Sequence, residues 1–315
     1  MTMTNYALVT GAAGFIGSRL VQSLLSSGRK VVAIDCFLPN LYPAETKKQR
    51  WEELLKLNSE RLHLFEFDMR VDDFSILDKF KIDSIFNEAA MPGLVSNWAN
   101  FAPYYDCNLS ALNRLLEYVK DFQIKSFVQA STSSVYGKIA VGPENQELKP
   151  TSPYGVSKLA AEKLLMAYKE WFDVPVKILR YFSVYGPNQR PDMAYAKILR
   201  CLMHNDIFKI YGDGHQKRTN TYIDDIVEAT ILAESRADVG DVMNICGDEA
   251  ISLNEAINII EEISEKKLQI EYIEVRKGDQ KETDGANFFA KKKLGWSATT
   301  DFRTGITNQI KVASL

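Results

Sequence analysis

Short apolar runs alternate with longer amphipathic stretches along the first half of the chain. Most of the short runs are continuous, which is typical of parallel strands buried on both faces. They predict strands at residues 7–10, 31–35, 62–67, 84–87, 126–130 and 176–180. The amphipathic stretches predict helices at residues 16–27, 46–57, 109–122 and about 152–172. This alternation predicts an α/β fold, with a doubly wound parallel sheet between layers of helices.

The regularity weakens after Gly186 and Pro187. Short strands are predicted at residues 208–211, 242–245 and 268–273. Helices are predicted between and beside them at residues 194–203, 225–234 and 253–263. We interpret this part as a smaller α/β lobe packed over one edge of the sheet, from which the chain crosses back to the main domain.

The composition and charge of the chain exclude several classes of function. The 315 residues are 46% hydrophobic and 25% charged, and the net charge is -3, so no basic field is available to hold a nucleic acid or an anionic membrane. No apolar run reaches the length of a membrane span, and no signal-like segment precedes the first strand. The four cysteines are far apart and only three histidines are present. We therefore expect a cytoplasmic protein that binds neither metal nor nucleic acid.

Three glycines follow the first predicted strand, and the next helix begins beside them. They are Gly11, Gly14 and Gly17, with Phe15 and Ile16 between the last two. In a dinucleotide site, one glycine permits a tight turn, another lets the backbone approach a pyrophosphate, and the third lets the helix pack on the strand. The anion then lies at the helix N-terminus. Because glycine turns after strands are also common for structural reasons, the triplet alone is weak evidence.

Asp35 strengthens the case for a dinucleotide, because it ends the second predicted strand. A carboxylate there accepts hydrogen bonds from the adenosine ribose and repels a 2′-phosphate, which favours NAD over NADP. The alternative for Asp35 is an ordinary turn residue. Asp68 and Met69 follow the third strand and Ala89 follows the fourth, so we predict that they also contact the cofactor. Asp68 is equally compatible with a solvated loop acid.

Tyr154 and Lys158 lie four residues apart at the start of a predicted helix, so both side chains fall on one face. A nearby ammonium group lowers the pKa of a phenol, which makes Tyr154 a candidate general base for a substrate hydroxyl. Thr132 follows the fifth strand, at the end of a parallel sheet where ligands bind, and is placed to share a hydrogen bond with the reacting oxygen. Taken singly, a chance Tyr-x-x-x-Lys pair and a loop hydroxyl with local hydrogen bonds are the alternatives.

Four motifs in a fixed order indicate a family. They are Gly-x-x-Gly-x-x-Gly at 11–17, Ser-Thr-Ser-Ser-Val-Tyr-Gly at 131–137, Ser-Pro-Tyr-Gly-Val-Ser-Lys at 152–158 and Arg-Tyr-Phe-Ser-Val-Tyr-Gly-Pro at 180–187. Together they resemble the extended short-chain dehydrogenase/reductase family of NAD-dependent nucleotide-sugar epimerases and dehydratases, from residue 8 to about residue 305. The resemblance implies a Rossmann-type NAD-binding domain at residues 1–187. It also implies a lobe at residues 188–315 that mainly binds a UDP- or GDP-linked sugar.

The resemblance assigns roles to the same residues. Tyr154 would be the base, Lys158 its partner and a contact of the cofactor ribose, and Thr132 the second hydroxyl. Tyr181 would contact the cofactor. A transient 4-keto sugar is implied, as is a homodimer formed by two helices of each subunit, here at residues 109–122 and 154–172.

Ser133 and Ser134 distinguish between reactions within the family. Relatives that dehydrate the sugar carry Asp-Glu at these two positions, and uronate decarboxylases usually carry Glu in place of Ser134. Elimination without an acid there lacks its proton carrier, whereas C4-epimerisation needs none. The two serines therefore favour an epimerase over a 4,6-dehydratase or a decarboxylase.

The run Gly-Pro-Asn-Gln-Arg-Pro-Asp-Met at 186–193 most resembles UDP-glucuronate 4-epimerases. Ser133, Ser134 and Ser183 suit a carboxylate on C5 of the sugar, because neutral donors hold it without helping it leave. The predicted substrate-binding cations are Arg190, Arg218 and Lys281.

Several substrate-facing positions depart from the family pattern. Asn-Glu-Ala-Ala at 87–90 replaces the usual His-Leu-Ala-Ala, and Val95 stands where close 4-epimerases place Arg. Arg218 matches the position where relatives clamp the diphosphate, but Thr-Asn at 219–220 replaces the usual Asp-Phe after it. Lys281 replaces a diphosphate-binding Arg and lacks its bidentate fork.

Two other functions remain open. A nucleotide-sugar 4-dehydrogenase would begin with the same Tyr154 and Lys158 but would release the 4-keto sugar. A non-catalytic NAD-binding module would be free to lose these residues, and both stand here together with Thr132.

Overall fold

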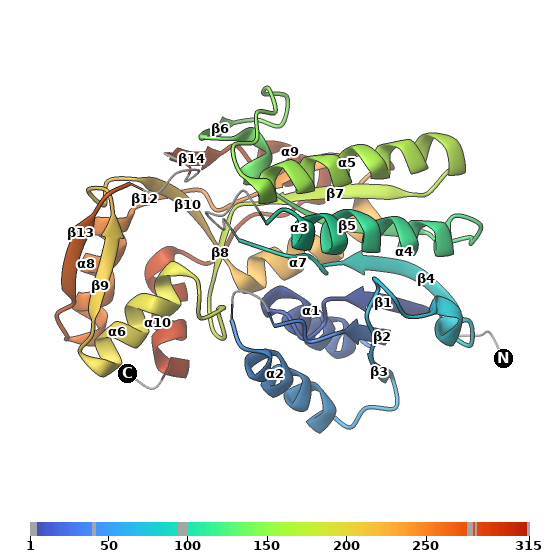
Figure 1. Ribbon diagram of the computed structural model, residues 1–315, viewed down its shortest axis with the longest axis horizontal. Coiled ribbons are helices and arrows are strands. Elements are labelled where there is room, and N and C mark those ends of the chain that lie inside the picture. Colours follow the sequence, from blue (N-terminus) through green and yellow to red (C-terminus); the bar gives the residue numbers. More distant parts are fainter. Residues whose placement is uncertain (1–4, 40–41, 94–99, 276–279, 281, 314–315) are drawn as a thin grey trace.

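The computed structural model describes residues 5–39, 42–93, 100–275, 280 and 282–313. At its centre is a parallel sheet of seven strands in the order β11-β7-β5-β4-β1-β2-β3 (Figure 1). The strands are β1 (Tyr6–Thr10), β2 (Lys30–Asp35), β3 (Leu62–Glu66), β4 (Ile82–Asn87), β5 (Ser126–Thr132), β7 (Val176–Tyr181) and β11 (Val242–Ile245). The strand order reverses between β1 and β4, which is where doubly wound sheets bind ligands. The predicted Rossmann-type fold is confirmed.

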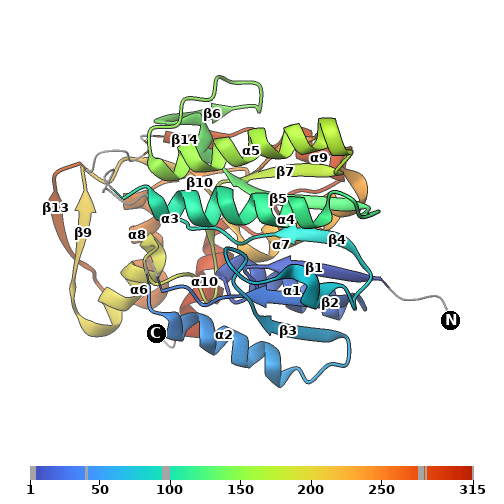
Figure 2. The same cartoon turned by 45° about the vertical axis from the view of Figure 1, so that its right-hand side comes forward.

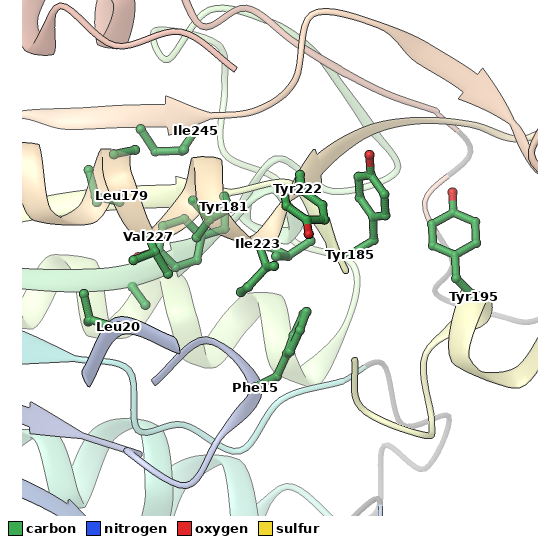
Figure 3. Close-up of a cluster of buried hydrophobic side chains, with 14 of the residues drawn as sticks. Phe15, Leu20, Leu179, Tyr181, Tyr185, Tyr195, Tyr222, Ile223, Val227 and Ile245 are labelled. Carbon is green, nitrogen blue, oxygen red and sulfur yellow. The ribbon is translucent and has the colours of Figure 1, made fainter. Parts of the chain in front are cut away.

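Helices cover both faces of this sheet, as its continuous apolar strands require. On one face α4 (Ala111–Val119) and α5 (Pro153–Phe172) bury leucines and alanines against the strands, and they lie side by side in Figure 2. On the other face lie α1 (Phe15–Ser26) and α7 (Ile223–Arg236), with α2 (Ala44–Lys56) beside α1. Figure 3 shows part of this second cluster, in which Leu20 and Val227 face the sheet residue Leu179.

The helix predicted at residues 109–122 is irregular in the structure. A short helix, α3 (Ala102–Tyr105), runs into a π-helical turn, η2 (Asp106–Ser110), and only then into α4. The cause lies at Asn108, whose side chain accepts a hydrogen bond from the Met91 amide (2.7 Å) and donates to Ser157 Oγ (2.9 Å). These buried contacts hold the turn in a widened form that apolar periodicity does not reveal.

A second sheet contains strands from both halves of the chain. Its order is β12-β10-β14-β6, and β8 pairs with β10. The strands are β6 (Ile139–Gly142), β8 (Ser183–Tyr185), β10 (Lys217–Tyr222), β12 (Ala250–Ser252) and β14 (Glu282–Gly285). The sequence did not predict them, because they are short or, like the Lys-Arg-Thr-Asn-Thr-Tyr strand β10, mainly polar.

The remaining elements lie beside the second sheet, at the left of Figure 1. They are a parallel pair, β9 (Ile207–Tyr211) and β13 (Gln269–Ile273), with helices α6 (Ala194–His204), α8 (Leu253–Ser264) and α10 (Phe302–Ala313). Helix α9 (Phe288–Leu294) instead packs against α7 and β11. Three strands cross the predicted boundary: β6 and β8 precede residue 187 and join the second sheet, whereas β11 follows it and pairs with β7. The division at residue 187 stays a prediction.

Candidate active site

A cavity opens at the carboxyl ends of β1, β2, β4 and β5, where the strand order reverses. Every predicted site residue that the structure describes lines it, except Arg218. The predicted residues in its wall are Gly11, Gly14, Phe15, Ile16, Gly17, Asp35, Asp68, Met69, Ala89, Thr132, Ser133, Ser134, Tyr154, Lys158, Tyr181, Ser183 and Arg190. The fold thus brings together residues that are up to 179 positions apart (11 to 190).

The glycine turn leaves no room for side chains. Gly11 has a φ of +64°, and a Cβ atom there would lie 2.8 Å from the Ala89 nitrogen. A Cβ atom on Gly17 would lie 2.2 Å from the Gly11 carbonyl oxygen, so this glycine allows α1 to pack against the turn. Gly14 is the N-cap of α1 and no side chain caps the helix. An anion at this wall of the cavity would therefore meet the first N–H groups of α1.

Asp35 fastens the glycine turn to strand β2. Its two carboxylate oxygens accept hydrogen bonds from the backbone amides of Ala13 (3.0 Å) and Phe37 (2.8 Å). Burial raises the pKa of this carboxyl, against the opposing charge of Lys47. A carboxylate has about four lone pairs, so beside its backbone hydrogen bonds, which include one from Cys36, Asp35 can still accept from a ribose hydroxyl.

Asp68 is held by its neighbour Arg70. Arg70 donates from Nε to Oδ1 of Asp68 (2.9 Å) and from a terminal nitrogen to Oδ2 (2.7 Å). This pairing lowers the pKa of Asp68. The next side chain, Met69, is buried against the core. Asp68 is therefore an ordered wall residue rather than a freely solvated acid.

Helix α5 places the predicted catalytic pair. Ser152 caps the helix by accepting a hydrogen bond from the Gly155 amide (3.1 Å), and Pro153 occupies the first turn. Tyr154 and Lys158 then follow on successive turns. The Lys158 ammonium donates to the Ala130 carbonyl oxygen (2.5 Å) at the end of β5. Both residues lie beside the buried Thr132 in the wall of the cavity.

The charges around Tyr154 differ from the sequence-based expectation. Burial raises the pKa of the phenol, and the largest opposing effects come from the Arg190 charge and a hydrogen bond with Thr132, not from Lys158. Burial lowers the pKa of Lys158 to about 8, although the carboxylates of Glu88 and Glu162 oppose this. The predicted joint effect of the Lys158 ammonium and a nicotinamide on the pKa of Tyr154 stays a prediction.

The substrate side of the cavity combines hydroxyls with one cation. Ser133 and Ser134 are buried in a short 3-10 helix, η3 (Ser133–Tyr136), and Ser183 begins β8. Arg190 makes a bidentate ion pair with Asp192 (3.0 and 2.7 Å). Arg190 therefore lines the same cavity as the three serines, with its charge paired to Asp192.

The other two predicted cations are not part of the described cavity wall. Arg218 donates to the carbonyl oxygens of Lys217 (2.8 Å) and Gln280. Lys281 and Val95 lie outside the described residues. Gln280, which the sequence did not single out, lines the cavity and donates to the Ser133 carbonyl oxygen (3.2 Å).

Glu88 is a wall residue whose role the sequence did not predict. Tyr181 donates a hydrogen bond from its phenol to Glu88 Oε1 (2.9 Å). Burial raises the pKa of this carboxyl to about 7. The signal was present in the Asn-Glu-Ala-Ala run at 87–90, where Glu88 stands in place of the usual Leu.

A buried polar network supports the four hydroxyl residues at 131–134, which we call the hydroxyl run. Arg180 and Glu162 form a bidentate ion pair (3.0 and 2.8 Å) with only 5% of each side chain exposed. Ser131 donates to the same carboxylate (2.5 Å), and Arg180 donates to the Tyr136 phenol (2.8 Å). The network therefore fixes β5 and η3 on both sides of Thr132.

Comparison with known proteins identifies the family. The family model described as GDP-mannose 4,6 dehydratase matches residues 8–309. The chain belongs to the extended short-chain dehydrogenase/reductase family of epimerases and dehydratases. This short-chain dehydrogenase/reductase is 39% identical over 312 residues to an uncharacterized UDP-glucose epimerase, YtcB, of Bacillus subtilis, covering 98% of this chain and 97% of that protein.

Two further relatives of this short-chain dehydrogenase/reductase have more specific names. It is 36% identical over 314 residues to a UDP-glucuronate 4-epimerase of Thermodesulfobacterium geofontis, covering 97% of this chain and 95% of the relative. The crystal structure of the UDP-glucuronic acid 4-epimerase from Bacillus cereus, in complex with UDP-glucuronic acid and NAD, matches with a TM-score of 0.93 and 36% identity, covering 98% and 99% of the two chains.

Within the described residues, no three His, Cys, Asp or Glu side chains are grouped closely enough to hold a metal ion. No helix in that part of the chain is long and apolar enough to cross a membrane.

Proposed function

We propose that this enzyme is an NAD-dependent nucleotide-sugar C4-epimerase, with a UDP-uronate as its substrate class. The observation that carries the proposal is the wall of a single cavity. An anion site on the glycine turn, a ribose acceptor at Asp35, and a base with its cations at Tyr154, Lys158 and Arg190 all line it. The similarity to UDP-glucuronate 4-epimerases along almost the whole chain supports the same reaction.

The glycine turn and Asp35 fit NAD. The missing Cβ atoms at Gly11 and Gly17 leave a backbone surface that a pyrophosphate can approach, and Asp35 keeps lone pairs for the adenosine ribose. Asp68, Met69, Ala89 and Tyr181 would complete the cofactor wall. When bound, NAD accepts a hydride from C4 of the sugar and later returns it.

The residues at the other end of the cavity act on the sugar hydroxyl. Tyr154 takes the proton of the 4-hydroxyl while Thr132 hydrogen-bonds the same oxygen, and the proton returns when the opposite configuration forms. The charge of Arg190 and the hydrogen bond with Thr132 lower the cost of forming the phenolate, and Lys158 is proposed as the partner of the base. Since burial raises the pKa of Tyr154, the positive charge of the oxidised cofactor is needed as well.

The serines suit a substrate that carries a C5 carboxylate. Ser133, Ser134 and Ser183 line the cavity together with Arg190, which is proposed to attract the carboxylate. No acidic side chain replaces either serine, so a dehydratase or decarboxylase would lack its proton carrier. Arg218 and Lys281 are proposed to contact the diphosphate.

The test is incubation of the purified protein with a panel of UDP- and GDP-sugars, with and without C6 carboxylates. NMR reports the configuration at C4, and absorbance at the NADH band reports net oxidation. A C4-inverted product without net NADH is the expected result. A ketone with stoichiometric NADH would identify a 4-dehydrogenase instead, and no turnover of any sugar would support a non-catalytic NAD-binding module.

We also propose a homodimer in the cytoplasm, with the domain boundary near residue 187. The ends of the α3–α4 and α5 helices expose Tyr105, Phe122 and Trp171, the last with 80% exposure, which supports burial against a second subunit. The four cysteines are free, as suits a reducing compartment. Sedimentation equilibrium of the full chain tests the dimer, and a monomer at micromolar concentration would contradict it.

A further inference from the structure

Glu88 is a carboxylic acid in the cavity that the proposed reaction does not use. It directly follows β4 and lines the cavity together with Tyr154 and Lys158. The Tyr181 phenol donates to Glu88 Oε1 (2.9 Å) and lies 2.7 Å from the Thr230 hydroxyl of α7. No salt bridge to Glu88 occurs within the part of the chain that the structure describes.

Few charged groups face this carboxyl. Tyr181 from β7 donates its hydrogen bond, Lys158 and Tyr154 face it from α5, and α7 contributes only the uncharged Thr230. The negative charge of Glu88 raises the pKa of Lys158 and of Tyr154. Glu88 is therefore electrostatically coupled to both groups at the reacting end of the cavity.

If the proposed function holds, the nicotinamide would lie close to Glu88, which lines the cavity beside Tyr154 and Lys158. Hydride transfer requires the nicotinamide ring to contact the sugar carbon whose hydroxyl meets Tyr154. The oxidised ring carries a positive charge and the reduced ring is neutral. An ionised carboxylate beside it stabilises the oxidised form, and the loss of the positive charge on reduction makes the carboxylate easier to protonate.

We propose that Glu88 takes up a proton from solvent when the bound cofactor is reduced and releases it when the cofactor is reoxidised. The carboxylate and one proton give the carboxylic acid, and Glu88 itself is neither oxidised nor reduced. The hydride comes from the sugar C4–H bond and the hydroxyl proton goes to Tyr154, so the proton on Glu88 is additional and returns to solvent in the second half of the reaction. Burial favours this exchange near neutral pH, because it holds the pKa of Glu88 at about 7.

The test is a redox titration of the NAD-loaded protein. Wild type, Glu88→Gln and Glu60→Gln are equilibrated with a redox dye at fixed potential between pH 6 and 8, and absorbance at the NADH band gives the ratio of reduced to oxidised cofactor. Glu60→Gln is the matched control, because Glu60 is exposed ahead of β3, at the opposite end of the strands from the cavity. Gln keeps the acceptor for Tyr181 but cannot take up a proton.

Reduction of NAD itself consumes one proton, so the ratio rises about tenfold for each unit fall in pH, and a coupled proton adds a factor of up to about ten. We expect a slope well above tenfold per pH unit for wild type and Glu60→Gln, and about tenfold for Glu88→Gln. At pH 8, Glu88→Gln is also expected to hold several-fold more reduced cofactor than wild type.

Two results would overturn the proposal. One is a ratio of reduced to oxidised cofactor that changes only tenfold per pH unit in wild type, and the other is identical ratios in wild type and Glu88→Gln. Failure of the proposed function is recognised separately, from the sugar panel, because a 4-dehydrogenase or a non-catalytic module would still bind NAD. Chromatography of the denatured protein that finds no NAD would overturn both proposals.

Discussion

Lys158 donates a hydrogen bond from its ammonium group to the carbonyl oxygen of Ala130, over 2.5 Å, and so joins the second turn of α5 to the end of β5. This contact holds the side chain of a buried lysine in the cavity wall, where the pKa of its ammonium is lowered to about 8. The charge of Lys158, the proposed partner of the base, is therefore lost at moderately alkaline pH.

The pH dependence of turnover follows from this lysine. Lys158 is charged below about pH 8, so kcat is expected to fall as the pH rises through that value. The Glu88 carboxylate raises the pKa of both Lys158 and Tyr154, so Glu88→Gln should move both limbs of the profile to lower pH. Profiles of kcat against pH measure this, with Glu60→Gln as the control. An unmoved profile in Glu88→Gln would show that Glu88 does not act on the catalytic groups.

Replacing the proposed base tests its role directly. Tyr154→Phe removes the hydroxyl and keeps the ring, so kcat should fall by about 10²- to 10⁴-fold while NAD stays bound. Tyr168→Phe is the matched control, because Tyr168 lies on the same helix and donates to Asn113 and Glu117, away from the cavity. NMR turnover and the NAD content of the purified protein are measured together. Undiminished turnover in Tyr154→Phe would exclude it as the base.

Asp35→Asn distinguishes the proposed contact of Asp35 with the cofactor ribose from its structural contact with the Ala13 amide. Loss of a charge-assisted hydrogen bond to the ribose is expected to weaken NAD binding by about tenfold to a hundredfold. Removing the charge should simultaneously improve NADP binding relative to NAD. Calorimetric titration with each cofactor measures both. An equal loss for the two cofactors would mean that Asp35 only fastens the Ala13 amide.

The buried ion pair beside the hydroxyl run has a stability test. Arg180→Met leaves the Glu162 carboxylate buried without its cation, which should lower the free energy of unfolding by about 3–5 kcal/mol. The double variant Arg180→Met with Glu162→Leu removes both charges and should recover most of that loss. Urea unfolding of the cofactor-free protein measures both. If the double variant is no more stable than the single one, the charge left behind is not the cause.

Glu88 also makes stability depend on pH. Because burial raises its pKa from 4.5 to about 7, the folded protein binds this proton more tightly than the unfolded chain does. The stabilisation is complete below about pH 4.5 and is lost as the pH rises through about 7. Each pH unit in that range is worth about 1.4 kcal/mol, so Glu88→Gln should be more stable than wild type at pH 8 by up to about 3 kcal/mol. Urea midpoints at pH 5 and pH 8 measure this, and an equal difference at both would contradict it.

The sequence predicted the elements whose pattern is local. The continuous apolar runs located the first-half strands of the central sheet to within two residues at each end, because such strands are buried on both faces. Strand β10 was missed because its Lys-Arg-Thr-Asn-Thr-Tyr sequence owes its strand conformation to pairing with β8, β12 and β14 rather than to its own residues. The predicted family and the predicted nucleotide-sugar 4-epimerase activity agree with the comparisons.

The candidate site likewise combines residues that local motifs predicted with contacts that they did not predict. Ordered motifs predicted most of its residues, since each motif ends a strand or begins a helix at one edge of the sheet. What they did not predict are contacts between motifs, such as Tyr181 with Glu88 or Gln280 with Ser133. These contacts depend on how distant segments pack. The charge of Arg190, which lowers the pKa of Tyr154, is a further example. The roles of the individual site residues stay predictions until the variants are measured.

The exchange of strands between the two sheets has a consequence during synthesis. β7 is complete once residue 181 has been made, but its outer neighbour β11 ends only at residue 245. Until then the growing polypeptide presents β7 as an unpaired edge, on which another chain can add. Ribosome-bound nascent chains that stop short of residue 242 should therefore need a chaperone to stay soluble, whereas those that include β11 should not.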